Sequence, residues 1–128
     1  MNNTLVQSQW VRVMTDYCAD PVWDKDGCNA PIEDLPVSDD LRIRLSAWED
    51  WFDLRCSDDP IPNYEEFVDT GFRLAAEVKR QLPEWTVIYH DPRLYGVAST
   101  ADTEITAETA ATTPPSFSAP EIRRLSEE

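Results

Sequence analysis

"LPVSDDLRIRLSAWEDWFD", residues 35–53, is the clearest helix signal in the chain. Ser38 followed by two aspartates is typical of a helix start, because a side-chain oxygen caps free backbone N–H groups and acids favour the positive end of the helix dipole. Beyond it, apolar residues recur at helical spacing in two stripes. The first stripe contains Leu41, Leu45, Trp48, Phe52 and Cys56, and the second contains Ile43, Ala47, Trp51 and Leu54. A helix with two apolar stripes usually packs on both a neighbouring helix and a sheet, so we expect it to be central.

A second helix is predicted from Tyr64 to the residue before Pro83, because proline cannot continue a helix. Asn63 with Glu66 three residues later resembles a capping box. Gly71 lies on the apolar face of this helix and costs about 1 kcal/mol of helix propensity relative to alanine. We therefore expect Gly71 to allow a close approach to the first helix.

Two segments alternate apolar and polar residues, as half-buried strands do: residues 10–17 before the helices and 84–90 after them. Residues 18–37 contain three prolines and a glycine and are predicted to form an irregular excursion, with a short strand at Val22 and Trp23. The predicted fold is α+β, with a small sheet of two or three strands packed on two antiparallel helices.

The composition changes near residue 97. Residues 97–128 are rich in Thr, Ala and Pro and show no apolar periodicity, which is typical of a flexible chain. We therefore predict an acidic α+β domain over residues 8–96 and a disordered C-terminal tail over residues 97–128.

The formal net charge is −14, from 25 acidic and 11 basic residues. Such a field repels nucleic-acid phosphates and anionic membranes and favours basic partners, although acidity can also serve solubility alone. The first residues resemble no signal peptide, and no apolar run is long enough to span a bilayer. We expect a cytoplasmic protein that binds neither nucleic acid directly nor a membrane.

The segment "VWDKDGCN", residues 22–29, resembles the first half of a calcium loop, because Asp24, Asp26 and Gly27 match its positions three, five and six. Val22 occupies the first ligand position and Pro31 interrupts the loop, so a tight Asp-Gly turn is the simpler interpretation. The possible zinc ligands lack the close pairing of zinc sites; they are Cys18, Cys28, Cys56 and His90. We predict no metal and no cofactor.

Catalysis has weak support. His90, the single histidine, precedes Asp91, and a Cys–His–Asp set is conceivable, but no cysteine lies in a nucleophile turn. Arg44 and Arg55 lie near Trp51 on the first helix, as either a cation–π cluster or a small anion site. We predict that the protein is not an enzyme and assign no catalytic residue.

Three segments together are similar to a family of small acidic bacterial single-domain proteins of immunity-like type: "DYCADPVWDKDG", "LPVSDDLRIRLSAWEDWFD" and "FVDTGFRLAAEVKRQLPEWTVIYHD". The resemblance covers roughly residues 10–91 and omits the Thr/Ala-rich segment. It implies a bacterial α+β domain with no assigned reaction and no catalytic residues. The matching positions are Tyr17, Pro21, Trp23, Leu35, Pro36, Ser38, Leu41, Leu45, Trp48, Gly71, Leu74 and Tyr89.

These observations favour a non-enzymatic protein-binding domain, of the immunity or antitoxin type, that inhibits a basic partner protein through electrostatic complementarity. The alternatives are a nucleic-acid-mimicking inhibitor of a nucleic-acid enzyme and a small metal-binding or hydrolytic protein. The predicted partner-binding residues lie in the acid-rich excursion and in the loop between the helices: Asp20, Trp23, Asp24, Asp26, Glu33, Asp34, Asp58 and Asp59.

Overall fold

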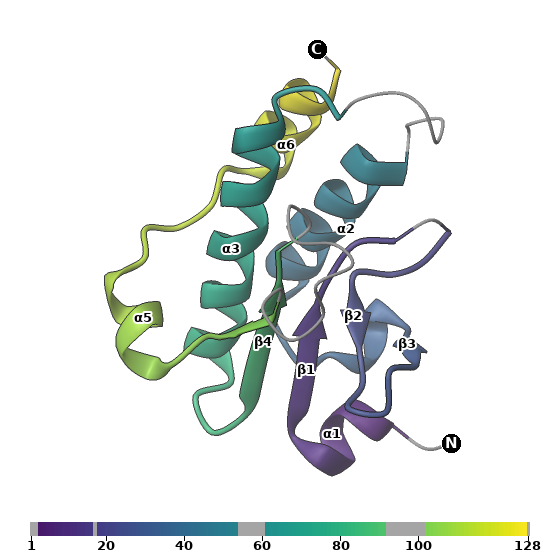
Figure 1. The fold of residues 1–128 in the computed structure, drawn as a ribbon, viewed down its shortest axis with the longest axis vertical. Helices are drawn as coiled ribbons and strands as arrows, with labels where there is room; N and C mark the ends of the chain where they lie inside the picture. The colour runs from purple at the N-terminus through teal and green to yellow at the C-terminus, as the bar shows by residue number, and fades with distance from the viewer. Residues whose placement is uncertain (1–2, 17, 54–60, 92–101, 128) are drawn as a thin grey trace.

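The computed structural model describes residues 3–16, 18–53, 61–91 and 102–127 (Figure 1). The elements in chain order are α1 (Thr4–Ser8), β1 (Trp10–Val13), β2 (Val22–Trp23), β3 (Asn29–Ala30), the 3-10 turn η1 (Ile32–Asp34), α2 (Asp39–Asp53), α3 (Tyr64–Gln81), β4 (Thr86–His90), β5 (Asp102–Glu104), α5 (Ala107–Thr112) and α6 (Ala119–Ser126).

The strands of the described chain form one sheet in the order β3-β2-β1-β4-β5. β1 and β4 are parallel neighbours at its centre, and the other pairs are antiparallel. The α+β class and the pairing of the two predicted strands are confirmed. The prediction of two or three strands and two helices is wrong, because the described residues contain five strands and five α-helices. The strands that were missed, β3 and β5, have only two and three residues, too few to show an alternating pattern.

The core lies between this sheet and the pair α2 and α3 (Figure 1). In the first apolar stripe of α2, Leu41, Leu45 and Trp48 are fully inaccessible and Phe52 is half-buried, while Cys56 lies outside the described residues. Trp48 stacks on Phe67 of α3 with ring centroids 5.4 Å apart, and its indole Nε1 donates a hydrogen bond to the Phe67 carbonyl. A buried tryptophan thus gains both aromatic packing and a partner for its polar N–H.

Gly71 allows Trp48 of α2 to approach α3 closely, as predicted. A Cβ atom built there would lie 2.3 Å from Trp48 Cζ2 and 2.9 Å from Tyr89 Cε1. No ordinary side chain fits between these rings, so the glycine allows α2, α3 and β4 to pack together.

The capping box predicted at Asn63 is wrong. Asn63 has left-handed backbone angles (φ 53°) and makes no side-chain cap to α3. Its Nδ2 instead donates a hydrogen bond of 2.8 Å to the carbonyl of Leu125 on α6. Asn63 therefore links the start of α3 to α6. The cap was mispredicted because the sequence analysis expected no helix at the C-terminal end that could accept this hydrogen bond.

The prediction of a disordered C-terminal tail is wrong for residues 102–127. β5 pairs with β4, α5 packs on α3, and α6 packs on α2 (Figure 1). Ile105 and Ile122 are fully buried, and Ala110 is nearly so. Ile105 and Ala110 stand singly among small polar residues and create no periodicity. For α6 a local helix signal existed, the Ser118 and Glu121 capping box followed by Ile122 and Leu125, but the composition-based prediction of a tail overrode it.

Candidate functional site

The acid-rich excursion folds into the β2–β3 hairpin followed by η1. Asp24 closes the hairpin: its Oδ1 accepts hydrogen bonds from the backbone N–H groups of Asp26 (2.9 Å) and Cys28 (3.0 Å), and its Oδ2 accepts one from Thr4 Oγ1 (2.8 Å). Gly27 supplies the positive φ of 86° that the turn requires. The predicted Asp-Gly turn is therefore confirmed.

Asp24 is also inaccessible, with 5% of its surface exposed. Burial raises the pKa of its carboxyl, but the hydrogen bonds from Cys28, Thr4 and Asp26 outweigh this effect and hold the pKa below its ordinary value. The carboxylate is charged and directed into the turn, so its role in the structure is to shape the hairpin.

The other predicted partner-binding residues divide into two groups. Asp20 accepts a hydrogen bond of 2.7 Å from the backbone N–H of Ile32, and the half-buried Trp23 donates one from Nε1 to the Met14 carbonyl. Asp26 and Glu33 are exposed and Asp34 is half-buried; Asp58 and Asp59 lie outside the described residues. Asp20 and Trp23 therefore fix the excursion, while Asp26 and Glu33 face solvent.

The acids of this set that the structure describes do not form one patch. Asp26 lines a hollow of about 180 Å³ beside α1, together with Asp24 and Lys25. Asp20 and Glu33 instead lie beside the outward side of α2, at two hollows of about 270 and 460 Å³. Both hollows include Ser46, so they are adjacent. We call their lining residues the α2 face: Cys18, Ala19, Asp20, Pro21, Ile32, Glu33, Asp39, Arg42, Ile43, Ser46, Glu49, Asp50 and Arg123.

Sequence reasoning missed the central residue of this face. Ile43 was assigned to the second apolar stripe, yet it is 52% exposed, while Ala47 and Trp51 of the same stripe are buried. Two apolar stripes cover so much of a helix that neighbouring elements need not bury every residue of the second one. The spacing of the stripe does not show which of its residues remains exposed to solvent.

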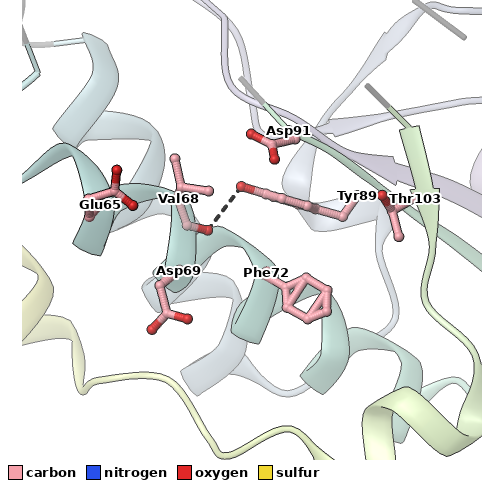
Figure 2. A pocket seen from close by; sticks show the side chains of 7 residues that line it. All are labelled: Glu65, Val68, Asp69, Phe72, Tyr89, Asp91 and Thr103. Carbon is pink, nitrogen blue, oxygen red and sulfur yellow. Dashed lines mark hydrogen bonds between the residues drawn. The ribbon is translucent and has the colours of Figure 1, made fainter. Parts of the chain in front are cut away.

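A separate pocket of about 390 Å³ lies between α3, β4 and β5 (Figure 2). Glu65 and Asp69, one turn apart on α3, and Asp91 after β4 line it together with the rings of Phe72 and Tyr89. The Tyr89 hydroxyl donates to the Val68 carbonyl (3.0 Å), as the dashed line in Figure 2 shows, and Asp69 pairs with Arg73 (2.8 Å). Sequence reasoning missed this pocket; its one signal was the pair of acids four residues apart.

His90 pairs with Asp102 of β5, at 2.9 Å between Nδ1 and Oδ1, and Arg12 of β1 contacts the other carboxylate oxygen at 2.7 Å. Burial raises the pKa of Asp102, but the hydrogen bonds from His90 and Arg12 outweigh it and lower the pKa below its ordinary value. This cluster links β1, β4 and β5, so the role of His90 in the structure is to stabilise the sheet.

Among the described residues, no group of three or more His, Cys, Asp or Glu side chains is arranged to hold a metal ion. The searched part of the chain also contains no helix with the length and hydropathy needed to cross a bilayer.

Comparison with known protein families matches residues 9–92 to the family described as Serratia CdiI immunity protein-like. Comparison with curated proteins found no matching relative. The matched residues contain β1 to β4 together with α2 and α3, which form the central sheet and both core helices. Because the match covers more than half of the chain, the protein belongs to the Serratia CdiI immunity protein-like family.

Proposed function

We propose that this protein is an immunity protein that neutralises a cognate toxin by binding it, and that the toxin presents a basic surface. The family match over residues 9–92 carries the proposal of a toxin partner. In this proposal the chain performs no reaction, acts in the cytoplasm and inhibits by covering a surface that the toxin needs.

The basic character of the partner is supported by charge. The chain has a formal charge of −14, and acids such as Asp26, Glu33, Asp39 and Asp50 are exposed. A field of this sign accelerates the encounter with a cationic protein and disfavours anionic competitors. Within the excursion, Asp26 and Glu33 are the exposed acids proposed to steer the partner during encounter, while Asp24 preserves the hairpin that presents Asp26.

The test uses the toxin domain encoded directly upstream of this chain, since an immunity gene normally follows its toxin gene. Co-expression of this protein is expected to restore growth to cells that produce the toxin domain. Purified proteins are expected to form a complex whose association rate falls steeply as ionic strength rises, because steering between opposite charges is screened by salt. Absence of both protection and complex would refute the proposal.

The electrostatic part has its own variants. The double variant Asp26→Asn, Glu33→Gln is expected to slow association several-fold at low salt. The matched control, Glu104→Gln with Glu108→Gln, removes the same charge from exposed positions on β5 and α5. Equal association rates for the two double variants would mean that the excursion does not guide the toxin.

A further inference from the structure

The outward side of α2 exposes a large apolar side chain where the surface is hollowed. Ile43 is 52% exposed, and of the large hydrophobic residues that the structure describes only Val6, at 44%, is also exposed. A single exposed hydrophobic residue is ordinary on a protein surface. Ile43 differs because it lines the larger hollow of the α2 face, next to Ser46, where the two hollows meet.

The helix geometry places a single row along this face. Asp39, Ile43, Ser46 and Asp50 are spaced by four, three and four residues, so they follow one side of α2. The row therefore has an apolar centre with a carboxylate at each end.

The surroundings of the row are acidic. Five carboxylates and two guanidinium groups line the two hollows. Both guanidinium groups are already paired within the face: Arg42 lies 2.7 Å from Asp39, and Arg123 lies 3.4 Å from Asp50. Glu33 adds an exposed acid beside the row. A partner must therefore bring positive charge to match this face.

We propose that the toxin docks on the α2 face, with basic side chains opposite Glu33 and Asp50 and with aliphatic surface covering Ile43. The inference rests on the proposed immunity function and specifies the surface that performs it. Arginine and lysine suit this face, because their methylene stems cover apolar surface while their charged heads reach acids at the rim. Ile43 then lies at the centre of the interface, where the most energetic contacts of protein complexes are found.

The other hollows fit such a partner less well. Val6 lies on α1, near a smaller hollow whose acids include the buried Asp24, which is directed into its own turn. The pocket of Figure 2 offers no exposed apolar side chain, because Phe72 is half-buried and Tyr89 is buried with its hydroxyl bonded to the Val68 carbonyl.

The experiment measures binding of the upstream-encoded toxin domain by full-length variants. Ile43→Ala is expected to raise the Kd about 30-fold, mainly through faster dissociation, as truncation of a central anchor does. Glu33→Lys is expected to weaken binding at least about tenfold through slower association. Ser46→Arg, which fills the junction of the two hollows without altering the apolar side chain, is expected to weaken binding as strongly as Ile43→Ala.

Ile43→Ala and Glu33→Lys each have a matched control away from the face. Val6→Ala removes a comparably exposed apolar side chain on α1, and Glu108→Lys reverses a charge on α5, on the opposite side of the molecule (Figure 1). Both controls are expected to bind within about threefold of the wild type. Thermal unfolding midpoints verify that every variant is folded.

The outcomes separate the two proposals. If the wild type binds the toxin but Ile43→Ala, Glu33→Lys and Ser46→Arg bind equally well, the docking face is wrong and the immunity function stands. If the wild type itself neither binds nor neutralises the toxin domain, the immunity function fails and the docking face fails with it.

Discussion

Arg44 of α2 and Glu77 of α3 form a two-pronged ion pair, with Nη1 2.6 Å and Nη2 2.8 Å from the two carboxylate oxygens. The side chains are only 10% and 12% exposed. Ser116, in the segment between α5 and α6, joins the pair: its backbone N–H donates to Glu77 Oε2, and its hydroxyl accepts from Arg44 Nη1. The sequence interpretation grouped Arg44 with Arg55 near Trp51, as a cation–π cluster or an anion site. Arg44 instead pairs with Glu77, and Arg55 lies outside the described residues. The pair ties both core helices to the C-terminal segment.

Glu77→Gln is expected to reduce the free energy of unfolding by about 2 kcal/mol, because the largely buried Arg44 guanidinium loses its two-pronged carboxylate partner and keeps only the exposed Asp40, 2.9 Å from its Nε. Urea denaturation at neutral pH measures the change. The control is Asp69→Asn, which breaks the exposed pair with Arg73 on the same helix and is expected to cost less than about 0.5 kcal/mol. Equal effects of the two substitutions would show that the Arg44–Glu77 pair adds nothing beyond a surface ion pair.

The same pair predicts a pH dependence. Burial raises the pKa of Glu77, but hydrogen bonds from Arg44 and Ser116 outweigh it and lower the pKa below its ordinary value of 4.5. A carboxyl with a lowered folded pKa stabilises the protein fully above its unfolded pKa, and that stabilisation is lost as the pH falls through the folded value. We therefore expect wild-type stability attributable to Glu77 to be constant down to about pH 5 and to decline below it.

Protonation of other acids also relieves repulsion in so acidic a protein, so the informative quantity is the difference between wild type and Glu77→Gln. Because glutamine does not titrate, this difference in unfolding free energy is expected to shrink between about pH 5 and pH 3. Urea midpoints at a series of pH values measure it. A difference that stays constant over this range would show that the Glu77 carboxyl has no lowered pKa.

Gly71→Ala is expected to destabilise the protein by about 1 to 3 kcal/mol, although alanine is the better helix former. The added Cβ would lie within 3 Å of the Trp48 and Tyr89 rings, and Trp48 is fully buried and cannot move aside. Gly27→Ala is the contrasting variant: nothing lies within 4 Å of its Cβ, so only the positive φ opposes it, at about 1 kcal/mol. A neutral or stabilising Gly71→Ala would mean that α2 and α3 are not held at this separation.

The sequence predicted the parts of the fold whose pattern is local. Helical spacing located α2 and α3, alternation located β1 and β4, and Gly71 indicated the close approach between helices. The structure retains these predicted elements because the residues that define each pattern all face the same core. The edge strands β3 and β5 escaped prediction because their pairing depends on neighbours distant in the sequence, not on their own few residues.

The candidate site was harder to predict, because charge alone does not distinguish a contact residue from a structural one. Asp24 and Asp26 are two residues apart, yet one is buried and accepts three hydrogen bonds while the other is exposed. For Ile43 the error was reversed: helical spacing grouped it with residues that are buried, yet its side chain is exposed. Which residue faces outward depends on what packs against the helix, and α6 was absent from the predicted fold.

Ile122→Ala tests the largest departure from the sequence prediction, the packing of residues 102–127 onto the core. Ile122 of α6 is fully buried, so its truncation is expected to cost about 2 to 4 kcal/mol of unfolding free energy through lost burial and a cavity. Arg124→Ala, two residues away on the same helix with a side chain 72% exposed, is the control and is expected to change stability by less than about 0.5 kcal/mol.

Urea denaturation measures both variants. A cooperative transition that is shifted only by Ile122→Ala would place α6 in the same folding unit as α2. If Ile122→Ala unfolded like the wild type, Ile122 would contribute nothing to the core, and α6 would not belong to the same folding unit as α2.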